Sequence, residues 1–209
     1  MPQSSSPKML PPLVEAAFVT GAAAWSQLPP PSAAEIAFAG RSNAGKSSAI
    51  NALARRAKLA FSSRTPGRTQ QINFFRLKSG AFAVDLPGYG YAAVSHKTKE
   101  EWQAFLWRYV TERATLTALV LLVDARRGIT ALDAPLIDVF VQSSRPVLIL
   151  ATKSDKLNRQ EQTRAIHAIR ADLRRQYSEL AETISVVLFS AVSKTGVDEA
   201  DNIILSWIG

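Results

Sequence analysis

The sequence contains no cysteine. A disulfide framework and any site built on thiolates, either for a metal or as a nucleophile, are therefore excluded. This absence fits a reducing cytosol. No apolar run approaches the roughly 18 residues that a membrane span needs. Pro11, Pro12 and Glu15 interrupt the one early stretch with some features of a secretory signal, so we expect a cytoplasmic protein with no signal peptide and no membrane contact.

Acidic residues are missing from one long window of the chain. Residues 41–78 hold no Asp or Glu but nine basic residues, which are Arg41, Lys46, Arg55, Arg56, Lys58, Arg64, Arg68, Arg76 and Lys78. The formal net charge of the whole chain is +8, so the remainder is close to neutral. Such a window is either a solvated basic surface or a contact surface for a polyanion larger than a nucleotide.

The length of 209 residues predicts a single domain. The first 33 residues are rich in Ser and Pro at both ends, around the helix-prone piece "VEAAFVTGAAAW". We expect residues 1–33 to form an N-terminal extension with a short helix packed on the domain. The domain itself is then expected over residues 34–209, as a monomer.

Strand-like and helix-like segments alternate after Glu35. The strand candidates are "EIAFAG", "QQINFFRL", "AFAVDLPG", "ALVLLVDA", "RPVLILATKSD" and "SVVLFSA", and "KSG" joins the second and third as a hairpin. Helical periodicity occurs in "SSAINALARR", in "KEEWQAFLWRYVTER" with a core-facing stripe of Trp102, Phe105, Leu106 and Tyr109, in "RQEQTRAIHAIRADLRRQY" and in "VDEADNIILSWI". This alternation predicts an α/β domain with a mostly parallel sheet, one antiparallel strand at an edge and helices on both faces.

A phosphate-binding loop is predicted directly after the first of these strands. The stretch "GRSNAGKSS" matches G-x-x-x-x-G-K-[ST] between an apolar strand and a helix. Glycines let successive backbone N–H groups point at phosphate oxygens, and the helix N-terminus adds positive potential. Lys46 would bridge the β- and γ-phosphates, and the Ser47 hydroxyl would ligate Mg²⁺. The predicted nucleotide contacts in this loop are Gly40, Arg41, Ser42, Asn43, Ala44, Gly45, Lys46, Ser47 and Ser48.

A second element for the metal and the γ-phosphate is predicted at "DLPG", which comprises Asp85, Leu86, Pro87 and Gly88 at the end of a strand. Asp85 would hold Mg²⁺ through water, and the Gly88 amide would sense the γ-phosphate. The loop "SSRTPGRTQQ" offers Thr65 and Thr69 for the third metal ligand. Thr69 is favoured because it lies closer to the next strand, whereas Thr65 precedes Pro66 and is biased to an extended backbone.

The stretch "TKSD", formed by Thr152, Lys153, Ser154 and Asp155, indicates that the base is guanine. Guanine offers N1–H and its 2-amino group as adjacent donors to one carboxylate, whereas adenine presents an acceptor at N1 and would be repelled. Asp155 is therefore the predicted specificity residue, and Lys153 would lie along the ring face. In "SAVSK" the backbone N–H of Ala191 would reach the guanine O6, and Phe189 and Ser190 complete this predicted contact. GTP and GDP are the expected ligands.

The stretches "GRSNAGKSS", "TPGRTQ", "DLPGYGYA", "TKSD" and "SAVSK", in this order, resemble the bacterial EngB (YihA/YsxC) family of Ras-like GTPases, within the TrmE-Era-EngA-EngB-Septin-like group. The resemblance runs from about residue 13 to the C-terminus. It implies a single G domain with a six-stranded sheet, and it selects Thr69 as the switch threonine within a nucleotide contact of Gly67, Arg68, Thr69, Gln70 and Gln71. It also implies a role in assembly of the large ribosomal subunit and in normal cell division and septation. The alternative is a regulatory GTPase that acts through a protein partner without contacting rRNA.

The resemblance leaves the source of catalytic assistance open. Ras-like enzymes position the attacking water with a glutamine after the D-x-x-G glycine, whereas this sequence has Tyr89 there. We therefore expect slow intrinsic hydrolysis, with Lys46, Thr69 and Asn43 as the catalytic candidates. Related GTPases use an asparagine at the Asn43 position to hold K⁺ beside the phosphates, but Asn43 could equally serve only the loop turn. Arg68 is a less favoured arginine finger.

The basic window gains a candidate partner from the same resemblance. The expected rRNA contacts are Arg55, Arg56, Lys58, Arg64, Arg68, Arg76, Arg170, Arg174 and Arg175, with Tyr89, Tyr91, His96, Lys97 and Lys99 beside the second switch. The two histidines, His96 and His167, have no companions at metal-ligand spacing in the sequence.

Overall fold

The computed structural model describes residues 10–60, 71–89, 96–178 and 181–208. These residues form one seven-stranded sheet with the strand order β1-β3-β4-β2-β5-β6-β7. The strands are β1 (Ala17–Ala22), β2 (Glu35–Gly40), β3 (Ile72–Arg76), β4 (Phe82–Asp85), β5 (Leu116–Asp124), β6 (Val147–Thr152) and β7 (Ile184–Leu188). All neighbouring strands pair in parallel except that β3 is antiparallel to both β1 and β4. The prediction of a mostly parallel sheet with one reversed strand is confirmed.

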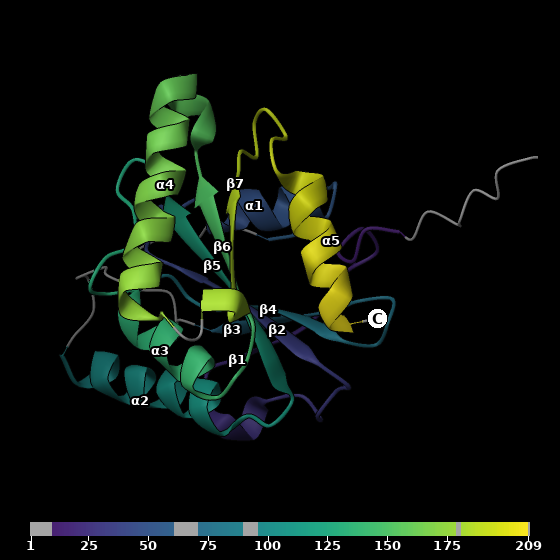
Figure 1. Ribbon diagram of the computed structural model, residues 1–209. Helices are drawn as coiled ribbons and strands as arrows, with labels where there is room; N and C mark the ends of the chain where they lie inside the picture. Colours follow the sequence, from purple (N-terminus) through teal and green to yellow (C-terminus); the bar gives the residue numbers. More distant parts are fainter. Residues whose placement is uncertain (1–9, 61–70, 90–95, 179–180, 209) are drawn as a thin grey trace, which may run out of the picture.

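Helices cover both faces of this sheet (Figure 1). They are α1 (Lys46–Leu53), α2 (His96–Glu112), α3 (Ala134–Gln142), α4 (Arg159–Gln176) and α5 (Val197–Ile208), with short 3-10 turns at Trp25–Gln27, Ser154–Lys156 and Ala181–Thr183. Helices α1 and α5 pack on one face and α2, α3 and α4 on the other. No helix among the described residues is long and apolar enough to cross a membrane.

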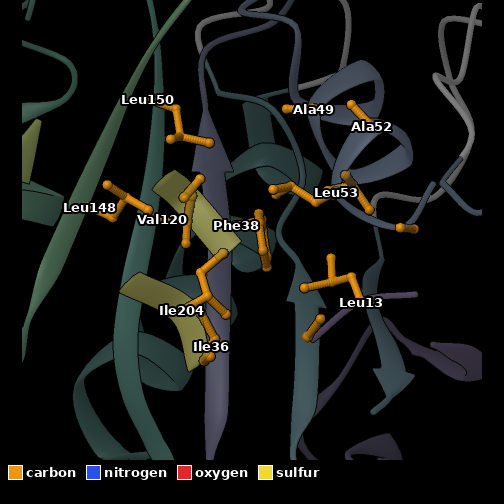
Figure 2. Close-up of a cluster of buried hydrophobic side chains, with 14 of the residues drawn as sticks. Leu13, Ile36, Phe38, Ala49, Ala52, Leu53, Val120, Leu148, Leu150 and Ile204 are labelled. Atoms are coloured by element: carbon orange, nitrogen blue, oxygen red, sulfur yellow. The ribbon is translucent and has the colours of Figure 1, made fainter. Parts of the chain in front are cut away.

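The core consists of two layers, one on each face of the sheet, and successive side chains along β2 point alternately into one layer and the other. Ile36 and Phe38 point toward α1 and α5, whereas Ala37 and Ala39 belong to the layer under α2, α3 and α4. Figure 2 shows the first layer, in which Ile36 and Phe38 of β2 lie together with Leu53 of α1 and Ile204 of α5. Strands β5 and β6 are buried on both faces, which explains their continuous apolar runs.

The helix boundaries follow from local signals in the sequence. Helix α4 begins with a capping box, because the Asn158 side chain accepts from the Glu161 N–H and the Glu161 side chain accepts from the Asn158 N–H. In α2 the predicted aromatic stripe is confirmed, since Tyr109 is fully buried and Phe105 packs against the core. The patterns above do not indicate α3, which buries Leu136, Ile137, Phe140 and Val141.

The N-terminal extension differs from the prediction. The piece "VEAAFVTGAAAW" contains the strand β1 instead of a short helix, and β1 adds a seventh strand where six were predicted. Consequently β3 does not lie at the edge of the sheet. The physical reason is tertiary pairing: β1 hydrogen-bonds along β3, and the Phe18 ring meets the Phe75 ring edge-on at 5.7 Å. These contacts outweigh the helix propensity of an alanine-rich segment.

Candidate nucleotide site

The predicted site loops lie at one edge of the sheet. The parallel strands β2, β4, β5, β6 and β7 end at the same edge, and β2 lies between β4 and β5, so connections leave it in both directions. In open α/β sheets, ligands bind in the crevice outside the carboxyl ends of the strands at this reversal point. The loops after these strands carry the phosphate, metal and base motifs predicted above.

The phosphate loop runs from Gly40, the last residue of β2, to Lys46, the first residue of α1. Two of its residues have left-handed backbone, Asn43 with φ 67° and Gly45 with φ 92°. Glycine adopts this conformation without the steric cost of a side chain. Because the first N–H groups of a helix have no intrahelical partners, the start of α1 offers donors to an anion.

Lys46 and Asp85 form an ion pair at the centre of the site. Asp85 ends β4, and the Lys46 and Asp85 side chains are only 13% and 7% exposed. Two predicted residues that are 39 positions apart in the chain therefore meet at the start of α1. Ser47, the next residue of α1, adds a hydroxyl oxygen, so this end of the helix offers the hard oxygen ligands that Mg²⁺ prefers.

The donor set fits Mg²⁺ better than a metal that needs a cage of side chains. The described residues contain no group of three or more His, Cys, Asp or Glu that could hold a metal ion. Mg²⁺ commonly takes one or two carboxylates and fills its remaining positions with waters and substrate phosphates. The third predicted ligand, Thr69, lies outside the described residues, as do Thr65, Gly67, Arg68 and Gln70.

The base-recognition motif is connected to the phosphate loop by side-chain hydrogen bonds. Thr152 Oγ1 donates to the Ala44 carbonyl at 2.6 Å. Lys153 has left-handed backbone with φ 59°, and its Nζ donates to the Asn43 carbonyl at 2.6 Å. These two bonds fix the motif after β6 against the loop after β2.

Asp155 and Ser190 bring the two predicted base-binding loops together. Ser190 is fully buried, and its Oγ donates to Asp155 Oδ1 at 2.7 Å. The same Oγ accepts from the N–H groups of Val192 and Ser193, both at 3.1 Å. The Ser190 hydrogen bond and nearby Lys156 lower the pKa of the Asp155 carboxyl. Asp155 is therefore a charged acceptor held in one orientation.

Tyr89 is hydrogen-bonded to the phosphate loop through its backbone and to Asp133 through its side chain. Its carbonyl accepts from the Ser42 N–H at 2.9 Å, and its hydroxyl donates to Asp133 Oδ1. The other oxygen of Asp133 accepts from the N–H and hydroxyl of Thr130. Burial, followed by the Asp133 charge, raises the pKa of Tyr89 above its usual range. The phenol is thus a neutral donor with an established partner.

Asp124 and Asp133 lie beside the predicted site, although the motifs did not indicate them. Both lie after or at the end of β5, beside a cavity of about 140 Å³ that also contacts Arg41, Ser42 and Arg126. A general signal was available for Asp124 alone, which ends an apolar strand predicted to lie in a parallel sheet, where ligands gather at strand carboxyl ends.

Several residues of the basic window have internal partners. Arg55 pairs with Asp198 and Asp201, Lys78 pairs with Glu15, and Arg56 donates to the Ala16 carbonyl. Gln71 is exposed just before β3, and Lys58 is exposed after α1. Arg64, Arg68 and Tyr91 lie outside the described residues, and of His96, Lys97 and Lys99 only the helical backbone is described.

The family model and the curated relatives that this chain matches are GTP-binding proteins. The family model described as "50S ribosome-binding GTPase" matches residues 35–153. Similar curated proteins are named "Probable GTP-binding protein EngB". The one from Azoarcus sp. (strain BH72) is 52% identical over 183 residues, which cover 88% of this chain and 86% of the relative. The one from Dechloromonas aromatica (strain RCB) is 48% identical over 194 residues, which cover 93% and 87%.

Solved structures show the same fold. A crystal structure of a probable GTP-binding protein engB matches with a TM-score of 0.64 at 23% identity, covering 84% of this chain and 98% of that one. A variant of Aquifex aeolicus Era bound to GDP and aluminium fluoride matches with a TM-score of 0.61 at 19% identity, covering 84% and 56%. The fold shared with these structures confirms the predicted fold class.

Proposed function

Because the chain belongs to the EngB family of GTP-binding proteins, we propose that it is a GTP-controlled cytoplasmic factor that assists assembly of the large ribosomal subunit and is needed for normal cell division and septation. GTP binding, and with it GTP hydrolysis, is the shared property of this family. The observation that best supports the switch is the meeting of Lys46 with Asp85 at the same sheet edge as the Asp155–Ser190 pair.

Asp155 is the proposed reader of the base. Its carboxylate would accept from guanine N1–H and from the 2-amino group, and the Ser190 hydroxyl keeps it charged and oriented. Lys153 would lie along the ring, and the Ala191 N–H would donate to O6. Two charge-assisted hydrogen bonds contribute about 1.5–3 kcal/mol each, which is enough to reject adenine.

Lys46 and Asp85 are the proposed phosphate-side residues. The Lys46 ammonium, which contacts Asp85, would exchange this carboxylate for β- and γ-phosphate oxygens as GTP enters. Ser47, Thr69 and, through water, Asp85 would hold Mg²⁺, which supplies positive charge against the phosphates. Gly88 would donate its N–H to the γ-phosphate, so Asp85–Gly88 would move with the nucleotide state.

The proposed intrinsic hydrolysis is slow because this chain offers no described side chain to orient water at the usual position. Tyr89 stands there, and its hydroxyl is already engaged by Asp133. Asn43 is the proposed K⁺ contact, with the cation in the role of an arginine finger. Its left-handed backbone, with φ 67°, also suits a purely structural role in the turn. Hydrolysis by the Asn43→Ala variant in Na⁺ and in K⁺ separates the two roles.

The charge distribution supports rRNA as the polyanionic partner. The window 41–78 lacks acidic residues, and Lys58 presents its side chain to solvent. Phosphate contacts release counterions, so an RNA-dependent complex weakens steeply as salt rises. A protein partner without RNA contact would show a weaker dependence, and this is the alternative that the experiment must separate.

Co-sedimentation with purified 30S and 50S subunits, in mature and immature forms, tests the proposal. We expect binding to 50S particles with a non-hydrolysable GTP analogue, little binding with GDP, and a loss of binding as salt is raised. Lys58→Glu should weaken the complex, whereas Arg159→Glu, the same charge change at an exposed position outside the window, should not. Absence of binding to every particle in either nucleotide state would refute the ribosomal role and favour the protein-partner alternative.

A further inference from the structure

Asp124 is a buried carboxylate that no motif of the nucleotide site includes. It ends β5, is 8% exposed, and lies between the strands that carry the phosphate loop and the base-recognition motif. Burying a charge in such a position is unfavourable unless partners compensate it. Its partners therefore indicate what the residue does.

Two basic side chains converge on Asp124. Arg126 binds both carboxylate oxygens, with Nε at 2.9 Å from Oδ1 and Nη2 at 2.7 Å from Oδ2. Lys153 Nζ donates to Oδ2 at 3.0 Å. The Arg126 hydrogen bonds, with a smaller contribution from Lys153, hold the pKa of Asp124 well below its usual range despite burial. The carboxylate is therefore charged at every physiological pH.

The backbone conformation and the side-chain ammonium of Lys153 are both held in place. Its backbone is left-handed, and its ammonium has two directed acceptors, Asp124 Oδ2 and the Asn43 carbonyl. A lysine side chain carries about 2 kcal/mol of rotamer entropy, which a free side chain would lose when nucleotide binds. A side chain already held in place lowers that cost.

We propose that Asp124 is a positioning residue for guanine-nucleotide binding, which acts by holding the Lys153 side chain against the phosphate loop in the arrangement that the base requires. This inference rests on the proposed role of Lys153 at the base. Arg126 orients the Asp124 carboxylate, so the chain of contacts runs from Arg126 through Asp124 and Lys153 to Asn43. Asp124 itself needs no contact with the nucleotide.

A purely local role for Asp124 makes a different prediction. Asp124 Oδ1 also accepts from the Arg126 N–H at 3.1 Å, and the Asp124 carbonyl accepts from the N–H groups of Arg127 and Gly128. If the carboxylate only shapes this turn, its removal should affect nucleotide binding equally whether or not Lys153 is present. If it acts through Lys153, its effect should vanish when Lys153 is replaced.

A double-mutant cycle on the release of fluorescent GDP separates these cases. The proteins are the wild type, Asp124→Asn, Lys153→Met and the double variant, with thermal melting as a check of folding. We expect Asp124→Asn to accelerate release about tenfold, which corresponds to about 1.4 kcal/mol. In the Lys153→Met background the same change should alter release less than about twofold. Asp172→Asn, which removes the partner of Arg175 on α4, is the matched control and should leave release unchanged.

Three results would overturn the inference. If Asp124→Asn accelerates GDP release equally in both backgrounds, the carboxylate acts only on the turn. If Asp124→Asn folds and leaves GDP release unchanged, Asp124 has no role in binding. No effect of Lys153→Met would remove the proposed base contact together with the inference, without bearing on ribosome binding. If Asp124→Asn fails to fold, Arg126→Ala, at a side chain that is 46% exposed, replaces it in the same cycle with a smaller expected acceleration of about threefold that again requires Lys153.

Discussion

Replacing Glu35 should lower the free energy of unfolding more than replacing any exposed charged residue, because Glu35 is the centre of a buried polar cluster. It is fully buried at the start of β2. Its carboxylate accepts from the Tyr109 hydroxyl at 2.7 Å, from the Thr115 hydroxyl at 2.8 Å and from Arg113 Nη2 at 2.6 Å. Arg113 also donates to the Pro29 carbonyl, so the cluster connects the N-terminal extension, β2, α2 and the segment before β5.

The expected magnitude follows from what Glu35→Ala leaves behind. Arg113 is 9% exposed and would keep its charge, with the Pro29 carbonyl as its one remaining hydrogen-bond partner among the described residues. Breaking a buried ion pair by removing one partner costs about 3–5 kcal/mol. A domain of this kind is stable by about 5–15 kcal/mol, so the variant should lose a large fraction of its free energy of unfolding.

Urea unfolding at pH 7 measures this loss. Glu112→Ala, which breaks the exposed ion pair with Arg108 within α2, is the control and should cost at most about 0.5 kcal/mol. Glu35→Ala combined with Arg113→Met should recover part of the loss, because the uncompensated buried charge is then gone. A cost below about 1 kcal/mol for Glu35→Ala, or no recovery in the double variant, would refute the argument.

Three further changes test other parts of the structure. Gly196→Ala should lower the free energy of unfolding by at least about 2 kcal/mol, because φ is 72° and a Cβ would lie 2.1 Å from the Leu188 carbonyl oxygen. Urea unfolding measures this loss, and an unchanged midpoint would contradict the prediction. Burial raises the pKa of Asp201 to about 6 from 3.8, so the folded state binds a proton more tightly than the unfolded state and this group's contribution to stability is lost as pH rises from about 4 to 6. Relative to Asp201→Asn, the free energy of unfolding of the wild type should fall by about 3 kcal/mol over that window. Parallel pH profiles of the two proteins would contradict this prediction. Asn158→Ala should cost about 1 kcal/mol through loss of the α4 capping box, and thermal melting that matches the wild type would show that the box contributes nothing.

The sheet and the loops of the site were predictable because their signals are local. Continuous apolar runs identify β5 and β6, and the motifs around Lys46 and Asp85 predict that both residues belong to one nucleotide site, where the structure pairs them. The family comparisons agree with the order of the motifs. The roles of individual site residues stay predictions until they are measured.

The features that escaped prediction depend on contacts between distant segments. Strand β1 forms because β3 offers it an edge, which its own composition does not reveal. Asp124 reaches Lys153 only because β5 and β6 are neighbours in register. In the same way, Asp133 accepts a hydrogen bond from Tyr89, 44 residues earlier in the chain, and no spacing in the sequence predicts that pair.

A titration of GDP and xanthosine diphosphate against the wild type and Asp155→Asn tests most directly whether Asp155 reads guanine. The wild type should bind GDP more tightly than xanthosine diphosphate. Asp155→Asn should lose at least about 100-fold in GDP affinity, because two charge-assisted hydrogen bonds are lost, and should bind the xanthine nucleotide better than GDP, because xanthine presents an acceptor where guanine has its amino group. Unchanged GDP affinity in the folded variant would contradict the claim that Asp155 reads guanine.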